Sequence, residues 1–530
     1  MKNISKISLI LFLVILFSGC NDYLDEIPRK GNGIELKTIE QLEALLAARA
    51  ENIERQALYD WNHAQRYMSD CYELSIDIYP GNEMWAWIED PIAVELNCLQ
   101  PQYTQEVEAG NSAWLYAFKN IYLANTVLFY LDKVTGGTTQ QRDILAQRAH
   151  FMRAYNYYEL ANCYCVPYCE TNLNELGLPL TTTIEYKEGT YSRSSLKELY
   201  DFIESELTLS LDLSVPLMEN GTRKVWRENN AAVNGFAARF YLTKGEYDKA
   251  GKFAQKALEC NSDLADYNNP SDIDMTNIII SDVDGNELEF AVSTWYQDTQ
   301  YDETILLAAD MQKSYYRRIS GSNSWMIPSQ KFVDKLKEED LRRKYFYYPQ
   351  YGDLGLFGYL AGIGFGELPG YSYFCGDDFD SGPSTAEMIL IKAEAMARQG
   401  QWQQAISYLN TDFRPYRISA DAAPEIKNLS AGNQDEAIAA ILEERMLEFP
   451  YTLRWHDIRR CNFNNDPNDD ITITRRFYEL DKGGIHDALE EGETVTYTLN
   501  SRSNKYLYTM AIPESEIFVS AGAIEQNRYE

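Results

Sequence analysis

Residues 237–250 read AARFYLTKGEYDKA, and residues 395–405 read AMARQGQWQQA. In both stretches a glycine, Gly245 or Gly400, is followed two residues later by an aromatic side chain and five residues later by an alanine. Glycine can take the left-handed conformation that ends a helix, and alanine at a crossing lets two antiparallel helices approach closely. Each stretch therefore predicts a helix, a tight turn and a second helix.

This helix-turn-helix pattern resembles the tetratricopeptide repeat. Two further helical regions fit less ideal copies: one runs from Trp114 to Leu131 and on from about Gln140 to Tyr164. The other covers 195–211, with Ser194 or Ser195 as its expected N-cap. The predicted fold class is mainly α, with a tetratricopeptide-like helical repeat scaffold of about four helix pairs.

The composition describes a globular, strongly acidic chain. Of its 530 residues, 45% are hydrophobic and 24% are charged, and 48 Lys and Arg face 80 Asp and Glu, for a net charge of -32. Such a surface repels a polyanion, so nucleic acid is not an expected partner. The four His include no His-x-x-x-His pair, which argues against a zinc enzyme.

The N-terminus predicts export and a lipid anchor. Residues 1–19 have a basic head, an apolar run too short for a stable membrane span, and small residues before Cys20. The sequence LFSGC at 16–20 resembles the lipobox of bacterial lipoproteins, in which acyl chains such as palmitate on the cysteine tether the protein to a bilayer. The acidic stretch NDYLDE that follows resembles the signal that sends Bacteroidetes lipoproteins to the outer face of the outer membrane.

A large irregular insertion, rich in loops, interrupts the helical pattern between about 265 and 382. It is dense in aromatic residues, and a second such segment spans 75–105. Long irregular segments on a rigid scaffold usually carry binding surfaces. We predict a signal peptide at 1–19 and one folded unit at 20–530, divided into an N-terminal part (20–264), a ligand-binding insertion (265–382) and a C-terminal part with the last repeat (383–530).

Four stretches in order carry a family resemblance. They are WLYAFKNIYLAN at 114–125, AHFMRAYNYYEL at 149–160, EERMLEF with RWHDIRR at 443–460, and AIPESEI at 511–517 with a terminal Gln526-Asn527. Behind a lipobox, this set resembles the SusD/RagB family of outer-membrane nutrient-binding lipoproteins over nearly the whole mature chain. Two departures are residues 450–453, where the family commonly has Glu-Gly, and the missing Asn-Pro before the C-terminus.

The resemblance implies a SusD-like fold docked on a SusC-like TonB-dependent transporter. It implies that the protein binds glycans without catalysis and passes them to the barrel; one branch of the family captures peptides instead. The motif residues are interpreted as structural, because a Glu-Arg-Glu set at helical spacing more often forms buried ion pairs than an active site. These residues are Glu444, Arg445, Glu448, Arg454 and Asp457.

Aromatic rings and neighbouring polar groups are the candidate ligand-binding residues, because rings pack on the apolar faces of sugars while amides and carboxylates bind hydroxyl groups. The rings are Trp85, Trp87, Trp295, Tyr296, Trp325, Tyr301, Tyr371 and Tyr373, and the polar candidates are Asn82, Glu83, Asp298, Asn323 and Asp377. No catalytic residue is predicted. A secreted glycoside hydrolase with two carboxylates, and a scaffold that holds other proteins, remain alternatives.

No cofactor is expected, although one calcium candidate exists. Asp282, Asp284 and Asn286 alternate around a glycine but lack the glutamate of a complete calcium loop. The acidic run 464–470 has similar oxygen ligands. Apart from Cys20, eight cysteines remain, so disulfides are possible but are not the scaffold, and the Cys163, Cys165, Cys169 cluster is interpreted as packed thiols rather than a metal site.

Overall fold

The structure is a computed structural model. It describes residues 35–47, 62–74, 76, 91–106, 113–185, 191–269, 275–281, 287–293, 313–316, 325–326, 328–351, 368–374, 381–480 and 494–529. For residues 62–64, 91, 104–106, 275–281, 287–293, 325–326, 348–351 and 368–374 it describes the backbone alone.

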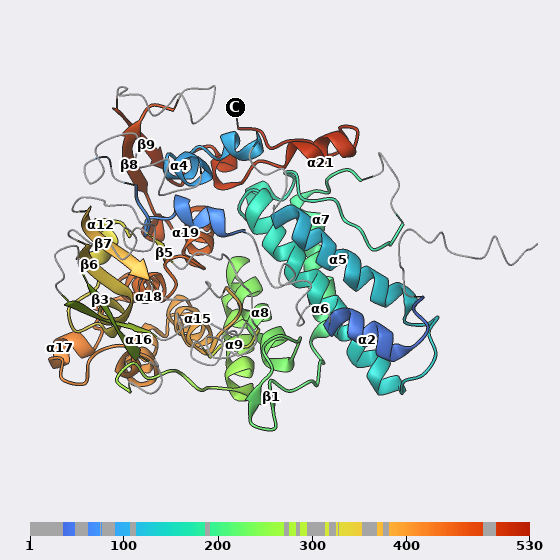
Figure 1. Cartoon of the computed structure of the whole chain (residues 1–530), viewed down its shortest axis with the longest axis horizontal. Helices are drawn as coiled ribbons and strands as arrows, with labels where there is room; N and C mark the ends of the chain where they lie inside the picture. Colours follow the sequence, from blue (N-terminus) through green and yellow to red (C-terminus); the bar gives the residue numbers. More distant parts are fainter. Residues whose placement is uncertain are drawn as a thin grey trace, which may run out of the picture.

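Helices dominate the N-terminal part, as predicted (Figure 1). Its elements are α2 (Ile39–Ala47), η3 (Asn62–Met68), α4 (Pro91–Asn97), η4 (Pro101–Glu106), α5 (Ala113–Tyr130), α6 (Thr139–Tyr164), η5 (Glu170–Asn172), α7 (Leu196–Ser210), β1 (Met218–Glu219), β2 (Thr222–Arg223), α8 (Asn230–Thr243) and α9 (Tyr247–Cys260). Ser195 caps α7 through a capping box with Glu198, and Thr138 caps α6 in the same way with Gln141. The predicted helices at 114–131, 140–164 and 195–211 are thus confirmed to within one residue at each end.

The two quoted stretches form the predicted helix pairs. Helix α8 turns into α9 at Gly245, which has φ +72°, and α15 (Thr385–Arg398) turns into α16 (Trp402–Asp412) at Gly400, which has φ +83°. Between the pairs, a Cβ on Gly251 of α9 would lie 3.1 Å from the Cβ of Ala395 on α15. The absence of a side chain at this position lets the two hairpins pack directly against each other.

The remaining C-terminal elements complete the helical frame and add a hairpin. They are η7 (Arg414–Tyr416), α17 (Pro424–Lys427), α18 (Gln434–Glu448), α19 (Arg454–Phe463), η8 (Pro467–Asp469), β8 (Ile473–Tyr478), β9 (Thr494–Leu499), η9 (Lys505–Tyr508) and α21 (Glu514–Val519). Strands β8 and β9 pair antiparallel along six residues each.

The predicted insertion contains short strands and helices in its described segments. Strands β3 (Met275–Ser281) and β4 (Glu287–Ser293) form an antiparallel hairpin. Strands β5 (Trp325–Met326), β6 (Tyr347–Tyr351) and β7 (Leu368–Phe374) form a sheet in the order β5-β7-β6, next to α12 (Gln330–Val333) and α13 (Leu341–Phe346).

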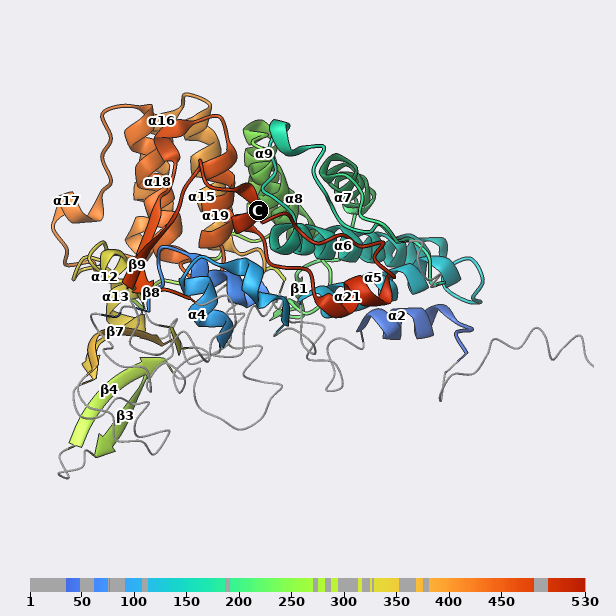
Figure 2. The ribbon, with the colours of Figure 1, turned by 90° about the horizontal axis from the view of Figure 1, so that it is seen from above.

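The hairpins have two distinct ends, which we call the strand end and the turn end. The N-caps of α8 and α15 lie together at the strand end, because the Asn229 side chain donates to the carbonyl of Tyr315 (2.8 Å) and the Tyr315 amide donates to that of Pro383 (2.7 Å). The Gly245 and Gly400 turns lie at the opposite end. Figure 2 shows the hairpins on one side of the molecule and β3, β4 and β7 on the other.

One hydrophobic core joins the helical frame to the insertion. Several rings from the aromatic-rich segment lie in this core and not on a binding surface: Tyr315, Tyr316, Tyr345, Phe346 and Tyr347, all 8% exposed or less. A ring-rich segment must still bury part of its apolar area against the frame, so its composition alone does not tell which rings face a ligand.

No disulfide joins the seven cysteines that lie within the described ranges. In the same part of the chain, no helix has the length and apolar character needed to cross a bilayer.

Candidate ligand-binding site

Three of the predicted ligand-binding residues lie on neighbouring strands of one sheet. In the backbone register, Tyr373 of β7 pairs with Tyr347 of β6, and the adjacent Phe374 pairs with Trp325 of β5. Tyr371 precedes Tyr373 by two positions on the same strand. The β5-β7-β6 sheet therefore brings together the backbones of Trp325, Tyr371 and Tyr373, although Trp325 is distant from the others along the chain.

The other predicted residues lie outside the described part of the chain. These are Trp85, Trp87, Trp295, Tyr296, Tyr301, Asn82, Glu83, Asp298, Asn323 and Asp377, together with the lipidation candidate Cys20 and the calcium candidates Asp282, Asp284 and Asn286.

Helix α12 fixes the end of β5 to the N-terminal part. The hydroxyl of Ser329, its N-cap, donates to the carbonyl of Asp70 (2.6 Å), and the Ser329 amide donates to the carbonyl of Cys71 (2.9 Å). Pro328 forms an isolated antiparallel bridge with Tyr72. The sheet is thus tied to the segment that precedes residues 75–105, the second ring-rich stretch.

Helix α13, which leads directly into β6, is held by a buried charge cluster. Arg342 is 3% exposed and pairs with Asp340 (2.6 Å), Glu444 (3.1 Å) and Glu448 (3.2 Å). Burial alone would lower the pKa of Arg342, but attraction by Asp340 and Glu444 outweighs it and raises that pKa. Because two of its partners belong to α18, this arginine joins the strand-bearing segment to the helical frame.

Two further arginines hold the N-terminal segment. Arg454, at the start of α19, forms two hydrogen bonds to the Asp70 carboxylate (2.6 and 2.7 Å). Arg475 of β8 donates to the carbonyls of Tyr67 (2.6 Å) and Tyr72 (2.7 Å), and also to those of Ser69 and Asn97. Both ring-rich segments are therefore anchored by residues from the last hundred positions of the chain.

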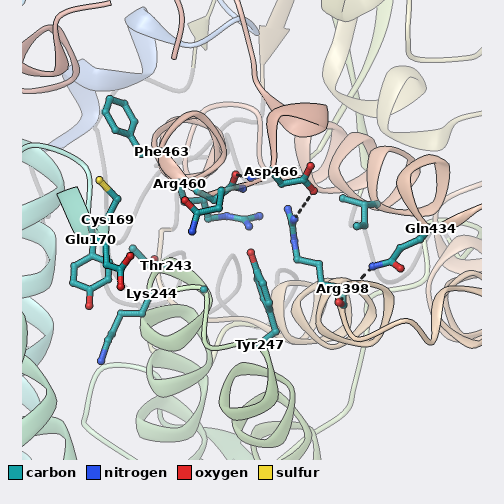
Figure 3. A pocket seen from close by; sticks show the side chains of 15 residues that line it. Cys169, Glu170, Thr243, Lys244, Tyr247, Arg398, Gln434, Arg460, Phe463 and Asp466 are labelled. Atoms are coloured by element: carbon teal, nitrogen blue, oxygen red, sulfur yellow. Dashed lines mark hydrogen bonds and ion pairs between the residues drawn. The ribbon is translucent and has the colours of Figure 1, made fainter. Parts of the chain in front are cut away.

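A separate cleft opens at the turn end. It has a volume of about 520 Å³ and lies between the 168–170 loop, the Gly245 turn, the end of α15 and the ends of α18 and α19 (Figure 3). Helix α18 runs from this cleft to the strand end, because Gln434 at its start bonds the carbonyl of Arg398 and Glu448 at its end pairs with Arg342. A 15-residue helix is roughly 20 Å long, so the cleft and the sheet are well separated.

Known protein families match both helical parts of the chain. A family model described as starch-binding and associating with the outer membrane matches residues 22–242, and a model of the SusD family matches residues 385–529. Together they cover more than half of the sequence. The chain belongs to the SusD/RagB family.

Solved structures of SusD-superfamily proteins have the same fold. A SusD superfamily protein from Bacteroides thetaiotaomicron aligns with a TM-score of 0.60 at 15% identity, over 93% of this chain and 100% of that one. A surface glycan-binding protein A from Bacteroides uniformis (TM-score 0.58, 17% identity, 93% and 100%) and a SusD-like carbohydrate binding protein from Bacteroides vulgatus (0.58, 17%, 92% and 97%) are similar. None of the curated proteins matches the sequence significantly.

The conspicuous motif of this SusD-family chain is structural, as predicted. Glu444 also pairs with Arg414, and Glu448 pairs with Arg417 (2.7 Å). Arg445 pairs with Asp457 (3.1 Å) inside the core. Burial would raise the pKa of Glu448, but Arg417 and Arg342 lower it, so this carboxylate stays ionised as an ion-pair partner.

The acidic run 464–470 is used for internal hydrogen bonds. Asp466 accepts from the backbone of Asn468, and the Asp469 carboxylate accepts from Asn464 (3.0 Å) and Arg398. Within the described residues, no group of three or more His, Cys, Asp or Glu side chains is arranged to hold a metal ion.

Sequence reasoning missed the cleft. None of the residues predicted to bind ligand is among the described residues that line it. Its ring-bearing residues are Tyr168, Tyr247 and Phe463, and Tyr247 served in the sequence-based prediction only as the aromatic that follows a turn glycine. One feature of the sequence could have indicated the cleft: this aromatic residue stands at the exposed end of a hairpin. A ring in that position can contact a ligand or an element outside its own helix pair.

Proposed function

We propose that this protein binds glycans at the cell surface and delivers them, chemically unchanged, to a SusC-like TonB-dependent transporter of the outer membrane. The observation that carries this proposal is the match to SusD-family models over both helical parts, one of them described as starch-binding. The structural neighbours with sugar- or glycan-binding names support the same class of ligand.

The proposed ligand surface is the ring-rich segment on the β5-β7-β6 sheet together with residues 75–105. A flat sugar face packs on an aromatic ring with little loss of side-chain entropy, because tyrosine and tryptophan have few rotatable bonds. The net charge of -32 favours neutral over strongly anionic glycans. Acyl chains on Cys20 would hold the protein at the membrane, with the folded part facing the exterior.

Glycan binding is tested by isothermal titration calorimetry with starch oligosaccharides and with a panel of plant and host glycans. We expect Trp325→Ala and Tyr373→Ala each to weaken affinity by about tenfold, since one stacked ring contributes roughly 1 kcal/mol. Tyr122→Ala, a half-exposed tyrosine on α5, is the control and should leave affinity unchanged.

The same titrations separate the alternatives. Chromatography of the glycan after incubation should recover it at its original length, and shortened products would replace the binding function with hydrolysis. Binding of peptides in the absence of glycan binding would assign the protein to the peptide-capturing branch. Equal affinity of the Trp325→Ala and wild-type proteins would remove the strand-borne rings from the site.

A further inference from the structure

The cleft at the turn end is large enough for a small ligand. Its volume of about 520 Å³ is within the range typical of ligand pockets. Its walls come from five separate parts of the chain, and Figure 3 shows the Tyr247 hydroxyl directed into the space between Arg460 and Arg398. The cleft is therefore formed by the packing of the hairpins and not by one local loop.

The arginines at the floor of the cleft are already neutralised. Arg398 pairs with Glu394 (2.8 Å), Asp466 (3.5 Å) and Asp469, and its side chain is 5% exposed. Arg460 pairs with the same Glu394 (2.6 Å) and with Asp457 (2.8 Å). Each guanidinium is thus engaged by carboxylates of the protein, so the floor offers little net charge to a ligand.

The third cation of the described lining is engaged as well. Lys244 pairs with Glu204 (2.5 Å) and Glu246 (2.7 Å) and is 11% exposed. An anionic ligand would have to compete with these carboxylates and would also enter the field of an acidic protein. The electrostatics therefore disfavour an anionic ligand.

The remaining lining groups suit a molecule with hydroxyl groups and an apolar face. Tyr168 and Tyr247 are half-buried, and neither hydroxyl has a hydrogen-bond partner within the described residues. Burial raises the pKa of Tyr247 to about 12, so its hydroxyl keeps its proton at neutral pH and can donate. Arg398 lies over the Tyr247 ring, 5.1 Å from its centroid, and the Tyr168 ring packs against Tyr200. Phe463 adds a third ring, and Asn465 and the amide oxygen of Gln434 add polar groups.

We propose that this cleft is a second saccharide-binding site for an uncharged sugar, separate from the strand-borne rings. The proposal rests on the proposed function for its ligand class. With the two sites at opposite ends of α18, a long glycan held at one site is available to the other at a high effective concentration.

Saturation-transfer NMR with glucose, galactose, mannose, xylose, N-acetylglucosamine and maltose tests the proposal. The background protein carries Trp325→Ala and Tyr373→Ala, which weaken the strand-borne site. We expect this protein to retain binding of at least one neutral sugar. Adding Tyr247→Ala should reduce the residual affinity at least tenfold, and Tyr247→Phe, which keeps the ring and removes the hydroxyl, should reduce it severalfold. Tyr122→Phe is the matched control on α5 and should have no effect.

Other results of these measurements would overturn the cleft site, the argument from charge, or both proposals. Residual binding that is unchanged by both Tyr247 variants, or absent from the background protein while the wild type binds, would overturn the cleft site and leave the proposed function intact. Tighter binding of glucuronate than of glucose in the background protein would overturn the argument from charge. A wild-type protein that binds no saccharide, in these spectra or in the calorimetric panel, would overturn both proposals.

Discussion

The ion-pair clusters at the two ends of the hairpins differ in their exposure to solvent. At the strand end, Arg342 pairs with Asp340, two residues away, and with Glu444 and Glu448, which are 102 and 106 residues away. All three acids are 7% exposed or less.

At the turn end, Arg398 pairs with Glu394 at i,i+4 and also with Asp466 and Asp469. Arg460 pairs with Asp457 at i,i+3 and also with Glu394, 66 residues away. Asp466 is 31% exposed. Both clusters therefore connect separate elements, but the strand-end cluster is fully buried, whereas the turn-end cluster borders a cleft and includes a partly exposed carboxylate, so the two should differ in their contribution to stability.

Removal of Arg342 should cause the largest loss of stability. Arg342→Met leaves three buried carboxylates without this cation and should lower the free energy of unfolding by about 3 to 5 kcal/mol. Arg398→Met should cost about half as much, because Glu394 keeps Arg460, Asp466 is partly exposed and the buried Asp469 keeps its hydrogen bonds from Asn464. Urea unfolding followed by circular dichroism measures both, and equal losses would show that the two ends are not distinct.

Acid should lower the free energy of unfolding by protonating Glu394 at the turn end. Burial alone would raise the pKa of Glu394, but Arg460 and Arg398 lower it from 4.5 to about 2. The unfolded chain therefore binds a proton at higher pH than the folded chain, and stability is present above pH 4.5 and lost as pH falls toward 2. We expect Glu394 to account for a loss of about 2 kcal/mol between about pH 5 and pH 3.

The control for this pH dependence is Glu394→Gln. This variant is less stable at neutral pH but should show a shallower decline of the unfolding free energy over the same acid range. Parallel declines of the two proteins would assign the acid sensitivity to other carboxylates, such as Asp70 and Glu448, whose pKa values are also lowered.

The turn glycines should contribute less to the free energy of unfolding than these buried charges. Gly400 has φ +83°, and no other part of the chain would lie within 4 Å of a Cβ added there, so Gly400→Ala introduces backbone strain without a steric clash. We expect a loss of about 1 kcal/mol, measured as a lower melting temperature, and a smaller loss for Gly400→Asn because asparagine tolerates this conformation better. No difference between the alanine and asparagine variants would contradict the conformational explanation.

The exposed ion pair on α9 should contribute least to the free energy of unfolding. Lys252 and Asp248 pair at 2.6 Å with both side chains about two-thirds exposed. Lys252→Met should change the free energy of unfolding by less than about 0.5 kcal/mol, since solvent screens such pairs. A loss close to that of Arg342→Met would mean that burial does not explain the strength of the strand-end cluster.

The helical frame could be predicted from the sequence because its signals are local. The glycine turns, the serine cap of α7 and the bounds of α6 each depend on residues within a few positions of one another. The pairing of Trp325 with Phe374 depends on long-range contacts, and nothing near either residue indicates it. The burial of Tyr316 also depends on the distant α6, because its ring contacts Phe151 and Tyr155. Tyr315 is held at its backbone carbonyl by Asn229, the N-cap of the distant α8.

The cleft was unpredictable for a related reason. Its residues stand at the ends of several helices, and each of these ends has an ordinary sequence of caps, charges and turn residues. Only the assembled packing of the hairpins reveals that Tyr168, Tyr247 and Phe463 line one cavity.

Arg475 also bears on the order in which the chain is made and folds. Its backbone partners at Tyr67 and Asn97 precede it by 408 and 378 residues. During synthesis these carbonyls cannot accept their hydrogen bonds from Arg475 until almost the whole polypeptide has been made. Such non-local contacts slow folding. The N-terminal segment should therefore reach its native state only after release of the finished chain, and a fragment that stops before β8 should remain sensitive to proteases.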